Sequence, residues 1–518
     1  MLVALDRFWI GMPLLYALTV GGLLAGFRRG RMPIERPWRR ALLSGVPVVL
    51  GAVVAWNIVV DLVEPPATHM QFQSLSVVLG FVFVACSSAL VGSLLARSSS
   101  KNAVARGTVV LDEKAPGSSA TGTGELTLAG CPFSLSDETK HFKMIGTTGT
   151  GKSTAINELL TQALARGDRA VIADPDGGYL DKFYDPARGD RVLNPFDPRA
   201  VRWDLFAEIV KPHDADQLAR SMIPDQEGQD RHWRGYARTL ITSIFRQLHR
   251  SNEHSLAALY ATLVTAQPTD LRGLLQGTPA AAFLAKDNGK FFDSVRSIAI
   301  DHLAAIEHLA HQTHDEALSV RKWIREGRGV LFLPYQANEI ASLRNIISTW
   351  MRLAIYETMS GHDDDRRIWF VVDELDALGA IDGLKDALAR LRKFGGRCVL
   401  GFQSIGQVRG TYGDTEAQTI VENCGNTVIL RCSASERGGT AEFASRLIGK
   451  REVIRPQFSV SRPRRFFGFL RQTGTVVNQI TTEDAVMASE IEQLPDLSGF
   501  LKRASRPDWR RVTLHRRV

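Results

Sequence analysis

Cysteine is scarce in this chain, with five residues among 518. None of them forms a C-x-x-C pair, and their spacing matches no zinc-binding pattern. This excludes a disulfide-stapled secreted scaffold and a zinc module. We therefore expect reduced, small apolar side chains in a cytosolic setting, and no structural metal. The five residues are Cys86, Cys131, Cys398, Cys424 and Cys432.

The middle of the chain lacks an excess of positive charge. Residues 1–40 hold seven Lys/Arg against two Asp/Glu, and residues 455–518 hold twelve against six. The two ends together carry +11 and the whole chain +8, which leaves −3 for the rest. The pI of about 9.3 is therefore weak evidence for nucleic acid. The run Arg462–Phe467 interleaves arginine with phenylalanine, which fits either a nucleic-acid contact or a membrane-proximal loop.

The most informative segment is a complete P-loop. Residues Gly146–Ser153 match G-x-x-x-x-G-K-[ST] at every position, after an apolar strand and before a helix-like run. Backbone N–H groups and the helix N-terminus would enclose phosphates, Lys152 would add charge, and Ser153 would offer a hydroxyl to Mg²⁺. We expect ATP to bind these nine residues: Gly146, Thr147, Thr148, Gly149, Thr150, Gly151, Lys152, Ser153 and Thr154.

A pair of acids far downstream completes the expected site. The apolar run 368–372 ends in Asp373 and Glu374, as when a buried parallel strand delivers carboxylates to its C-terminal edge. Asp373 would hold Mg²⁺, and Glu374 would act as general base on the attacking water. The separation of 221 positions between Lys152 and Asp373 predicts a substantial insertion. No L-S-G-G-Q segment precedes Asp373, which argues against an ABC transporter.

Three apolar stretches near the N-terminus have the length of membrane spans: residues 8–27, 41–63 and 74–96. Six arginines lie between the first two, whereas residues 64–73 contain no Lys or Arg. The positive-inside rule then places the N-terminus outside and the P-loop in the cytoplasm. A cleaved signal peptide is disfavoured, because cleavage would leave the arginine-rich loop on the wrong side.

The remaining pattern predicts an α/β protein. Strand-like runs at residues 170–173, 330–333, 368–372, 398–402 and 427–430 alternate with helical segments, which favours a parallel sheet. Between about residues 204 and 328 only helical periodicity is evident, so an all-α insertion is expected.

The histidines at 302, 308, 311 and 314 could bind a metal, but their polar surroundings favour a solvated helix face or loop.

Several further motifs occur in a fixed order along the chain. Asp174-Pro175-Asp176-Gly177 follows the P-loop, Gly-Phe-Gln-Ser follows the acidic pair at 401–404, and Leu494-Pro495-Asp496-Leu497 lies near the end. With the N-terminal anchor and the helical insert, this order resembles the conjugative coupling proteins, the TrwB/TraD-type ATPases of type IV secretion. The resemblance covers residues from about 107 to 505.

The resemblance implies a RecA-like P-loop NTPase domain carrying an all-α domain, behind N-terminal transmembrane helices. We expect an anchor at 1–97, the NTPase domain at 98–204 and 328–505, the all-α domain at 205–327 and a basic tail at 506–518. Such proteins form homo-hexameric rings in the bacterial inner membrane, with the ATPase part in the cytoplasm. Family members commonly show two spans, so residues 8–27 are either an additional anchor or an interfacial segment.

The resemblance also implies function and further site residues. The ring would receive a relaxase–DNA complex, bind single- and double-stranded DNA, meet the inner-membrane components of the secretion channel, and pump single-stranded DNA using ATP and Mg²⁺. Gln403 matches the glutamine that senses the γ-phosphate, and Arg392 matches the arginine that reaches into a neighbour's site, with Arg397 as a nearby rival.

Two alternative functions stay open: a related membrane-linked DNA translocase and a nucleotide-switched substrate receptor. A pure switch, however, needs no general base such as Glu374.

Overall fold

The structure is a computed structural model that describes residues 19–21, 103–112, 125–225, 230–285, 288–312, 316–361, 366–434, 439–461 and 473–515. Nearly all of the three expected membrane spans lies outside these residues, as do Cys86, His314 and the run Arg462–Phe467. Within the described ranges, no helix combines the length and apolar character that a bilayer crossing requires.

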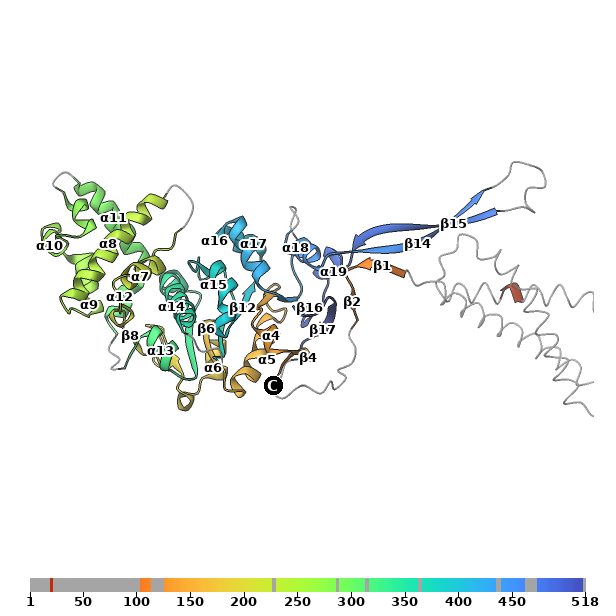
Figure 1. The fold of residues 1–518 in the computed structure, drawn as a ribbon, viewed down its shortest axis with the longest axis horizontal. Helices are drawn as coiled ribbons and strands as arrows, with labels where there is room; N and C mark the ends of the chain where they lie inside the picture. The colour runs from red at the N-terminus through yellow and green to blue at the C-terminus, as the bar shows by residue number, and fades with distance from the viewer. Residues whose placement is uncertain are drawn as a thin grey trace, which may run out of the picture. The chain divides into compact units, whose positions relative to one another are not determined.

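The chain divides into two compact units, residues 1–105 with 453–481 and residues 106–452 with 482–518. Apart from residues 19–21, the described residues of the first unit lie in a three-stranded sheet in the order β1-β14-β15, built from β1 (Ala103–Gly107), β14 (Lys450–Ser461) and β15 (Thr473–Asp484). The second unit contains the expected site (Figure 1).

A ten-stranded sheet forms the centre of the second unit. Seven neighbouring strands, from β13 to β7, are parallel, and β16 and β17 extend this sheet in antiparallel pairing. All five strands expected from the sequence are present. The order is β2 (Val110–Leu111), β17 (Trp509–Thr513), β16 (Ser498–Lys502), β13 (Asn426–Ile429), β5 (Phe142–Ile145), β12 (Gly396–Phe402), β11 (Ile368–Val372), β6 (Arg169–Pro175), β10 (Val330–Tyr335) and β7 (Arg191–Val192).

Helices cover both faces of this sheet, because the central strands are apolar at successive positions. In β6, Ala170 and Ile172 pack into one core cluster, and Val171 and Ala173 pack into the other. The first cluster includes the buried side of α5 (Lys152–Ala165), and the second includes α14 (Ile340–Ser360) and the helices after β11. Burial on both faces explains why these strands read as continuous hydrophobic runs rather than alternating ones.

A helical region follows β8 (Arg202–Trp203) and is grouped in green in Figure 1. Within it, α8 and α11 pack against each other. One short strand, β9 (Ala317–Leu318), pairs with β8, so the stretch expected to be wholly helical is not. The helices are α7 (Asp214–Met222), α8 (Arg231–Arg250), α9 (Leu256–Tyr260), α10 (Pro268–Leu274), α11 (Gly289–His302), α12 (Ala305–Ala310) and α13 (Val320–Glu326).

The buried carboxylate of Glu208 holds the start and the end of this region together. Glu208 accepts hydrogen bonds from Trp203 Nε1 over 3.0 Å, from the Val320 amide over 2.6 Å and from Ser319 Oγ over 3.1 Å. Burial raises the pKa of Glu208, and these donors oppose the rise. Trp203 also packs edge-on against Trp350 of α14, with ring centroids 5.8 Å apart. These contacts hold the start and the end of the helical region together and pack them against α14.

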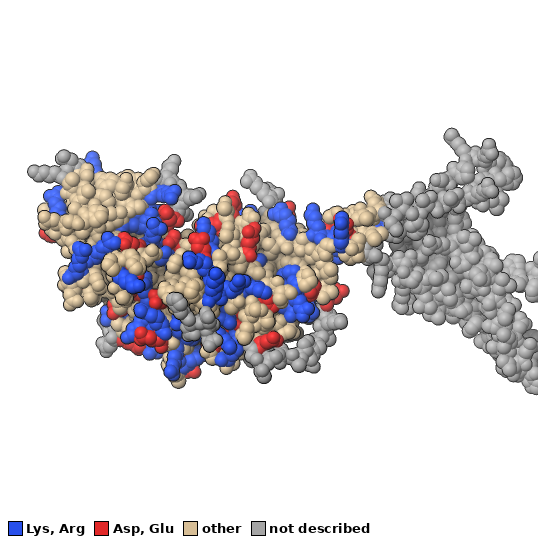
Figure 2. All heavy atoms as spheres, viewed as in Figure 1, with Lys and Arg blue, Asp and Glu red and all other residues tan. Residues whose placement is uncertain are grey.

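The expectation of a basic tail over residues 506–518 is wrong for its central part. Trp509–Thr513 form β17, which pairs with β16 and β2 inside the large sheet. Trp509, Val512 and Leu514 are buried, and these apolar side chains are spaced among the arginines that suggested a tail. On the face shown in Figure 2, lysine and arginine are interspersed with aspartate and glutamate, as the balanced charge of the middle region predicts.

Candidate nucleotide-binding site

The P-loop joins the C-terminal end of β5 to the start of α5, as the sequence predicts. Gly151 adopts a φ of +119°, and a Cβ there would lie 2.9 Å from Leu497 Cδ2. The loop is held by the chain's C-terminal part: the Leu497 amide donates to Thr150 O over 2.9 Å, and the Thr147 amide donates to Arg431 O over 2.9 Å. Glycine is therefore required at 151 both for its backbone conformation and for this contact.

Lys152 lies inside the loop that it belongs to. Its Nζ donates to Gly146 O over 2.8 Å and to Thr147 O over 3.4 Å, and the side chain is largely buried. Burial lowers the pKa of Lys152, and the carboxylates of Asp373 and Glu374 oppose the change. The ammonium group is thus placed among backbone groups where an anionic phosphate would replace carbonyl oxygens as its partner.

Asp373, the expected magnesium ligand, directly follows β11 and faces the P-loop serine. Asp373 Oδ2 accepts hydrogen bonds from Ser153 Oγ over 2.7 Å and from the Tyr179 hydroxyl over 2.8 Å. Asp373 is 4% exposed, and its Oδ1 is buried without a hydrogen-bond partner among the described residues. A buried carboxylate oxygen without a donor is costly unless a cation or its water occupies the adjacent space. These residues therefore fit a magnesium site.

The second acid, Glu374, is linked by hydrogen bonds to two other side chains at the same edge of the sheet. Gln403 Nε2 donates to Glu374 Oε1 over 2.8 Å, and Gln403 Oε1 accepts from Thr148 Oγ1 over 2.9 Å. Burial raises the pKa of Glu374, and the hydrogen bond from Gln403 lowers it. Gln403 follows β12, which lies between β5 and β11 in the sheet. The strand order thus brings the glutamine between the P-loop and the candidate base.

Sequence reasoning missed Tyr179, which the structure adds to this cluster. It lies in α6 (Gly178–Phe183), directly after the Asp-Pro-Asp-Gly motif. Asp174 anchors this helix by accepting from the amides of Tyr179 over 3.1 Å and Leu180 over 2.7 Å. Burial raises the pKa of Asp174 to about 6. An acid near the end of a buried strand, four residues before the start of a helix, was the available signal.

Arg397 and Arg392, the two candidates for the arginine that reaches into a neighbouring subunit's site, have different surroundings. Arg397 is buried, and its Nε donates to Glu138 Oε2 over 2.9 Å, so it serves the fold. Arg392 is exposed in the 3₁₀ turn Arg392–Phe394, and its side chain forms no hydrogen bond or ion pair with any described residue. The helix that precedes this turn, α15 (Leu384–Leu391), begins after Gly383 at φ +72°.

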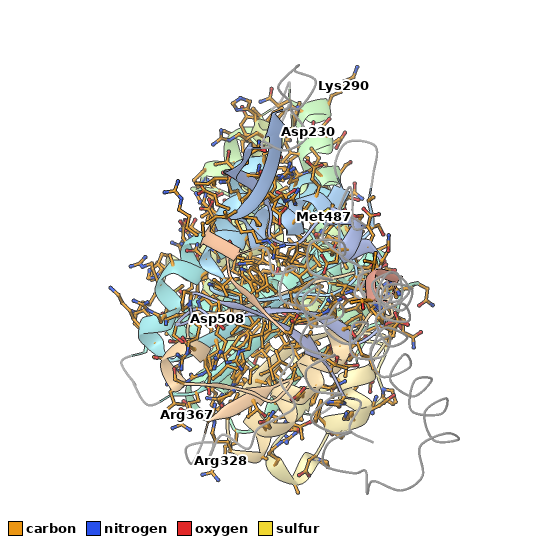
Figure 3. The ribbon with its side chains drawn as sticks, turned by 90° about the vertical axis from the view of Figure 1, so that its right-hand side faces the viewer. Asp230, Lys290, Arg328, Arg367, Met487 and Asp508 are labelled. Atoms are coloured by element: carbon orange, nitrogen blue, oxygen red, sulfur yellow. The ribbon has the colours of Figure 1, made fainter. Side chains whose placement is uncertain are left out.

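Arg392 lies at the edge of the sheet opposite its own P-loop. It precedes β12, whose seven residues extend over about 20 Å before reaching Gln403. Arg367 and Arg328, which come just before β11 and β10, are together at the lower end of the view in Figure 3 and mark the same amino-terminal edge. Arg392 therefore cannot contact a nucleotide in its own chain's loop.

The histidines near residue 308 and the cysteines, the other groups considered for metal binding, lie in different surroundings. His308 packs edge-on against Phe196 at 4.9 Å, and His311 Nδ1 lies 2.6 Å from Glu307 O. Within the described ranges, no three His, Cys, Asp or Glu side chains are grouped as a metal would require. The four described cysteines are free thiols and buried.

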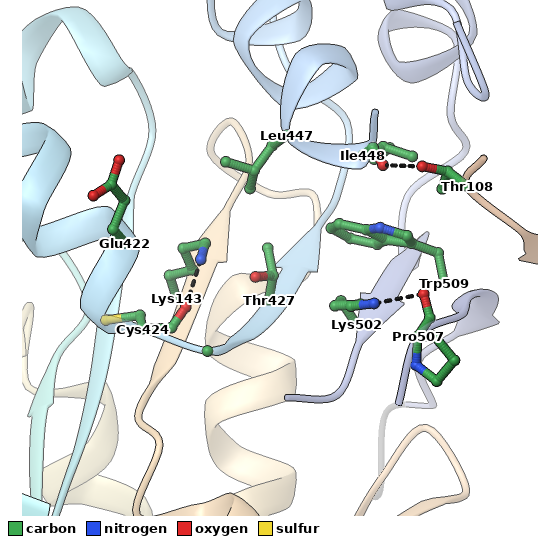
Figure 4. Close-up of a pocket in the computed structure, with 11 residues that line it drawn as sticks. Thr108, Lys143, Glu422, Cys424, Thr427, Leu447, Ile448, Lys502, Pro507 and Trp509 are labelled. Atoms are coloured by element: carbon green, nitrogen blue, oxygen red, sulfur yellow. Dashed lines mark hydrogen bonds between the residues drawn. The ribbon is translucent and has the colours of Figure 1, made fainter. Parts of the chain in front are cut away.

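A separate hollow of about 370 Å³ opens beside β5, β13 and β17 (Figure 4). Its two lysines are already engaged by backbone oxygens: Lys143 Nζ donates to Val421 O over 3.0 Å and to Cys424 O, and Lys502 Nζ donates to Pro507 O over 2.6 Å. The lining includes none of the P-loop residues. It is distinct from the nucleotide site.

The parallel strand order, the P-loop after β5, and the acids after β11 define a P-loop nucleoside-triphosphate-binding protein. Residues 125–515 match the family described as "Type IV secretion-system coupling protein DNA-binding domain". The chain belongs to this family of type IV secretion-system coupling proteins. Its described part is a RecA-like α/β NTPase with an all-α domain.

Individual relatives agree with this assignment. The chain is 31% identical over 386 residues to "Coupling protein TraD" of Escherichia coli (strain K12), a match that covers 73% of this chain and 53% of TraD. It is 24% identical over 393 residues to "Conjugal transfer protein TraG" of Escherichia coli, covering 66% and 59%. The chain thus spans about half the length of these relatives.

Solved structures of one relative resemble the chain closely. "Bacterial conjugative coupling protein TrwBdeltaN70" superposes with a TM-score of 0.69 and 31% identity, covering 80% of this chain and 94% of that one. "Plasmid coupling protein TrwB in complex with ADP and Mg2+" gives a TM-score of 0.68 and 31% identity, covering 81% and 95%. Another TrwB structure is a complex with a non-hydrolysable ATP analogue.

Proposed function

We propose that this chain is a membrane-anchored ATPase that couples a relaxase–DNA complex to a type IV secretion channel and pumps single-stranded DNA during conjugation. One observation carries the enzymatic part of this proposal. Ser153 and Asp373 are hydrogen-bonded over 2.7 Å, and Glu374 lies next to them in the chain of contacts with Gln403 and Thr148. These groups come from three strands and converge at one sheet edge.

Each side chain has a defined role in this proposal. The P-loop amides and Lys152 hold the phosphates of ATP, while Ser153 and Asp373 hold Mg²⁺, which neutralises charge on the phosphate oxygens. Glu374 accepts the proton of the attacking water, and Gln403 keeps its carboxylate oriented. Binding of ADP with Mg²⁺ and of an ATP analogue by TrwB supports these cofactors.

Arg392 supports a site shared between neighbouring subunits, and the number six is what the family resemblance implies. Its exposed side chain lies at the edge of the sheet away from its own P-loop, so only a neighbouring subunit can place it against γ-phosphate. An arginine supplied in trans typically accelerates phosphoryl transfer by about 10³–10⁵. We propose that hydrolysis requires this contact, which makes the rate depend on assembly.

Localisation and partners follow from the sequence and from the family. We propose that residues 1–97 anchor the chain in the bacterial inner membrane by two or three spans, with the NTPase part in the cytoplasm. The partners are single- and double-stranded DNA, the relaxase and its complex, and inner-membrane components of the secretion channel. The family's description as a DNA-binding domain supports the nucleic-acid partner.

The test is an ATPase assay on the detergent-solubilised chain over a range of protein concentrations, with and without single-stranded DNA. We expect the specific activity to rise with concentration, and DNA to stimulate it by promoting the ring. Changing Glu374→Gln should retain ATP binding while abolishing turnover. Negative-stain images with a nucleotide analogue should show six-fold rings.

Two results would overturn the proposal. A strictly monomeric preparation with full activity would remove the role of Arg392. Unchanged turnover in Glu374→Gln would remove the general base. The variant Glu422→Gln, on the surface-exposed side of α17 (Asp414–Asn423), is a matched control that should retain wild-type turnover.

A further inference from the structure

We infer that Tyr179 is a positioning residue for the magnesium-binding carboxylate, because its hydroxyl, together with that of Ser153, holds Oδ2 of Asp373 in place beside the P-loop. The inference rests on the proposed nucleotide site and adds a residue that lies outside both the P-loop and the acidic pair. It is carried by the contacts among Asp373, Ser153 and Tyr179.

The two oxygens of Asp373 have different surroundings. Oδ2 accepts from both Ser153 Oγ and the Tyr179 hydroxyl, at 2.7 and 2.8 Å, whereas Oδ1 is buried without a partner among the described residues. A carboxylate oxygen has about two lone-pair positions, so these donors occupy Oδ2. Rotation of the carboxylate would break both hydrogen bonds in a buried site, which is unfavourable. The side chain is therefore held in one orientation, with Oδ2 beside the P-loop serine.

Tyr179 is itself held rigidly with respect to Asp373. The two strands before them are neighbours, and Ala173 of β6 is opposite Val372 of β11. Asp174, near the end of β6, is therefore level with Asp373, which directly follows β11, and it accepts from the amides of Tyr179 and Leu180. Tyr179 is 3% exposed, so its ring has no space to turn away. The position of the hydroxyl is set by the sheet register.

This arrangement matters because magnesium demands near-ideal octahedral geometry and keeps several waters. A carboxylate that is already oriented loses no freedom when the metal and its water arrive. Without the Tyr179 hydroxyl, Ser153 alone would hold Oδ2, and Ser153 must also offer its oxygen to the metal. The carboxylate would then sample orientations in which Oδ2 is turned away from Ser153.

A purely structural role makes a different prediction. If the hydroxyl only satisfied a buried acid, Tyr179→Phe would lower the unfolding temperature and leave the magnesium requirement unchanged. Tyr184 is a matched control, because it caps the other end of α6, packs against Phe332 at 6.3 Å, and its hydroxyl has no hydrogen bond to any described residue. Tyr184→Phe removes the same atom from the same helix.

The experiment measures equilibrium binding of a fluorescent ADP analogue to the full chain in detergent, titrated with Mg²⁺ or held in EDTA. For Tyr179→Phe we expect unchanged affinity in EDTA and a roughly tenfold higher Mg²⁺ concentration for half-maximal enhancement, the size expected for one hydrogen bond to a charged group. Tyr184→Phe should match wild type. Thermal unfolding without nucleotide establishes that each variant is folded.

An unchanged or lower Mg²⁺ requirement in a folded Tyr179→Phe chain would overturn the inference and leave the proposed function standing. Wild-type protein whose ADP binding ignores Mg²⁺ would instead overturn both. If Tyr179→Phe does not fold, Asp174→Asn serves as the second variant, since it weakens the anchor of α6 without touching the carboxylate of Asp373. The same rise in Mg²⁺ requirement is expected there.

Discussion

The side-chain amide of Gln403 donates a 2.8 Å hydrogen bond to the carboxylate of Glu374, although the two residues follow different strands of the sheet. The strands β11 and β12 are adjacent and parallel, so their carboxyl ends meet at this point. The donor favours the ionised form of Glu374, while burial favours the neutral form. The balance between them determines the pH at which this base is available.

Replacing Gln403 should therefore shift the pH dependence of ATP hydrolysis. Gln403→Ala removes the donor, raises the pKa of Glu374, and moves the acidic limb of kcat/KM to higher pH, with a loss of about tenfold in rate at neutral pH. The profile of kcat/KM against pH is the measurement. Gln418→Ala removes an exposed amide on α17 that donates to Glu422 over 2.7 Å, and should leave the profile unchanged.

The two neighbouring arginines should fail in different ways. Arg392→Ala should fold with wild-type stability and lose hydrolysis by about 10³ or more. Arg397→Ala removes a buried partner of Glu138 and should lower the free energy of unfolding by about 2 kcal/mol or more. Denaturant unfolding and ATPase rates together distinguish them. A loss of stability in Arg392→Ala would contradict the assignment.

Mixing two inactive variants should restore activity if the site is shared. Arg392→Ala keeps Glu374 intact, and Glu374→Gln keeps Arg392 intact, so a mixed ring contains some complete sites. We expect equimolar mixtures to recover a measurable fraction of wild-type ATPase activity, whereas either variant alone stays inactive. Failure to recover in rings shown to contain both variants would mean that each site is completed within one chain.

Stability should fall at acidic pH because of His141. Burial lowers its pKa to about 4, and the Cys398 amide donates to Nδ1, so Nε2 carries the proton toward Leu388 O. The unfolded state takes up a proton near pH 6.5 and the folded state only near 4, so stability is lost between these values. The loss amounts to about 3 kcal/mol from this group.

The variant His141→Asn isolates this contribution. Asparagine tolerates the positive φ of 57° at this position and does not titrate. The free energy of unfolding should then depend less on pH between about 7 and 4, although it is lower at neutral pH. The exposed His213→Asn is the control, and it should keep the wild-type slope. An equal slope in His141→Asn would exclude this residue as the source.

The P-loop should be sensitive to a single methyl group. Gly151→Ala would combine a φ of +119° with a contact of 2.9 Å to Leu497, so we expect a loss of about 2–3 kcal/mol in stability and weaker nucleotide binding. Gly167 has a φ of +88°, and an added methyl group there would meet nothing within 4 Å, so Gly167→Ala should cost only about 1 kcal/mol. Chemical denaturation of both variants measures the difference.

Local patterns in the sequence were sufficient for much of this protein. The P-loop and the strand before Asp373 are contiguous segments whose residues identify both the structure and the ligand, so they could be predicted directly. The five expected strands were found for the same reason, because burial on both faces leaves an uninterrupted apolar run.

Other features depend on partners that are distant in the chain. Arg397 and Arg392 look alike in sequence, and only Glu138, 259 residues before Arg397, makes one structural and leaves the other exposed. Tyr179 reaches Asp373 across 194 residues because β6 and β11 are neighbours.

The sequence alone therefore determined the type of chemistry, since phosphate and metal ligands are encoded by short motifs. The tertiary structure decided which polar side chains surround those ligands, because strand order and register bring together residues that no local pattern connects. The same holds for β17, whose apolar residues become a strand only where β16 offers an unpaired edge.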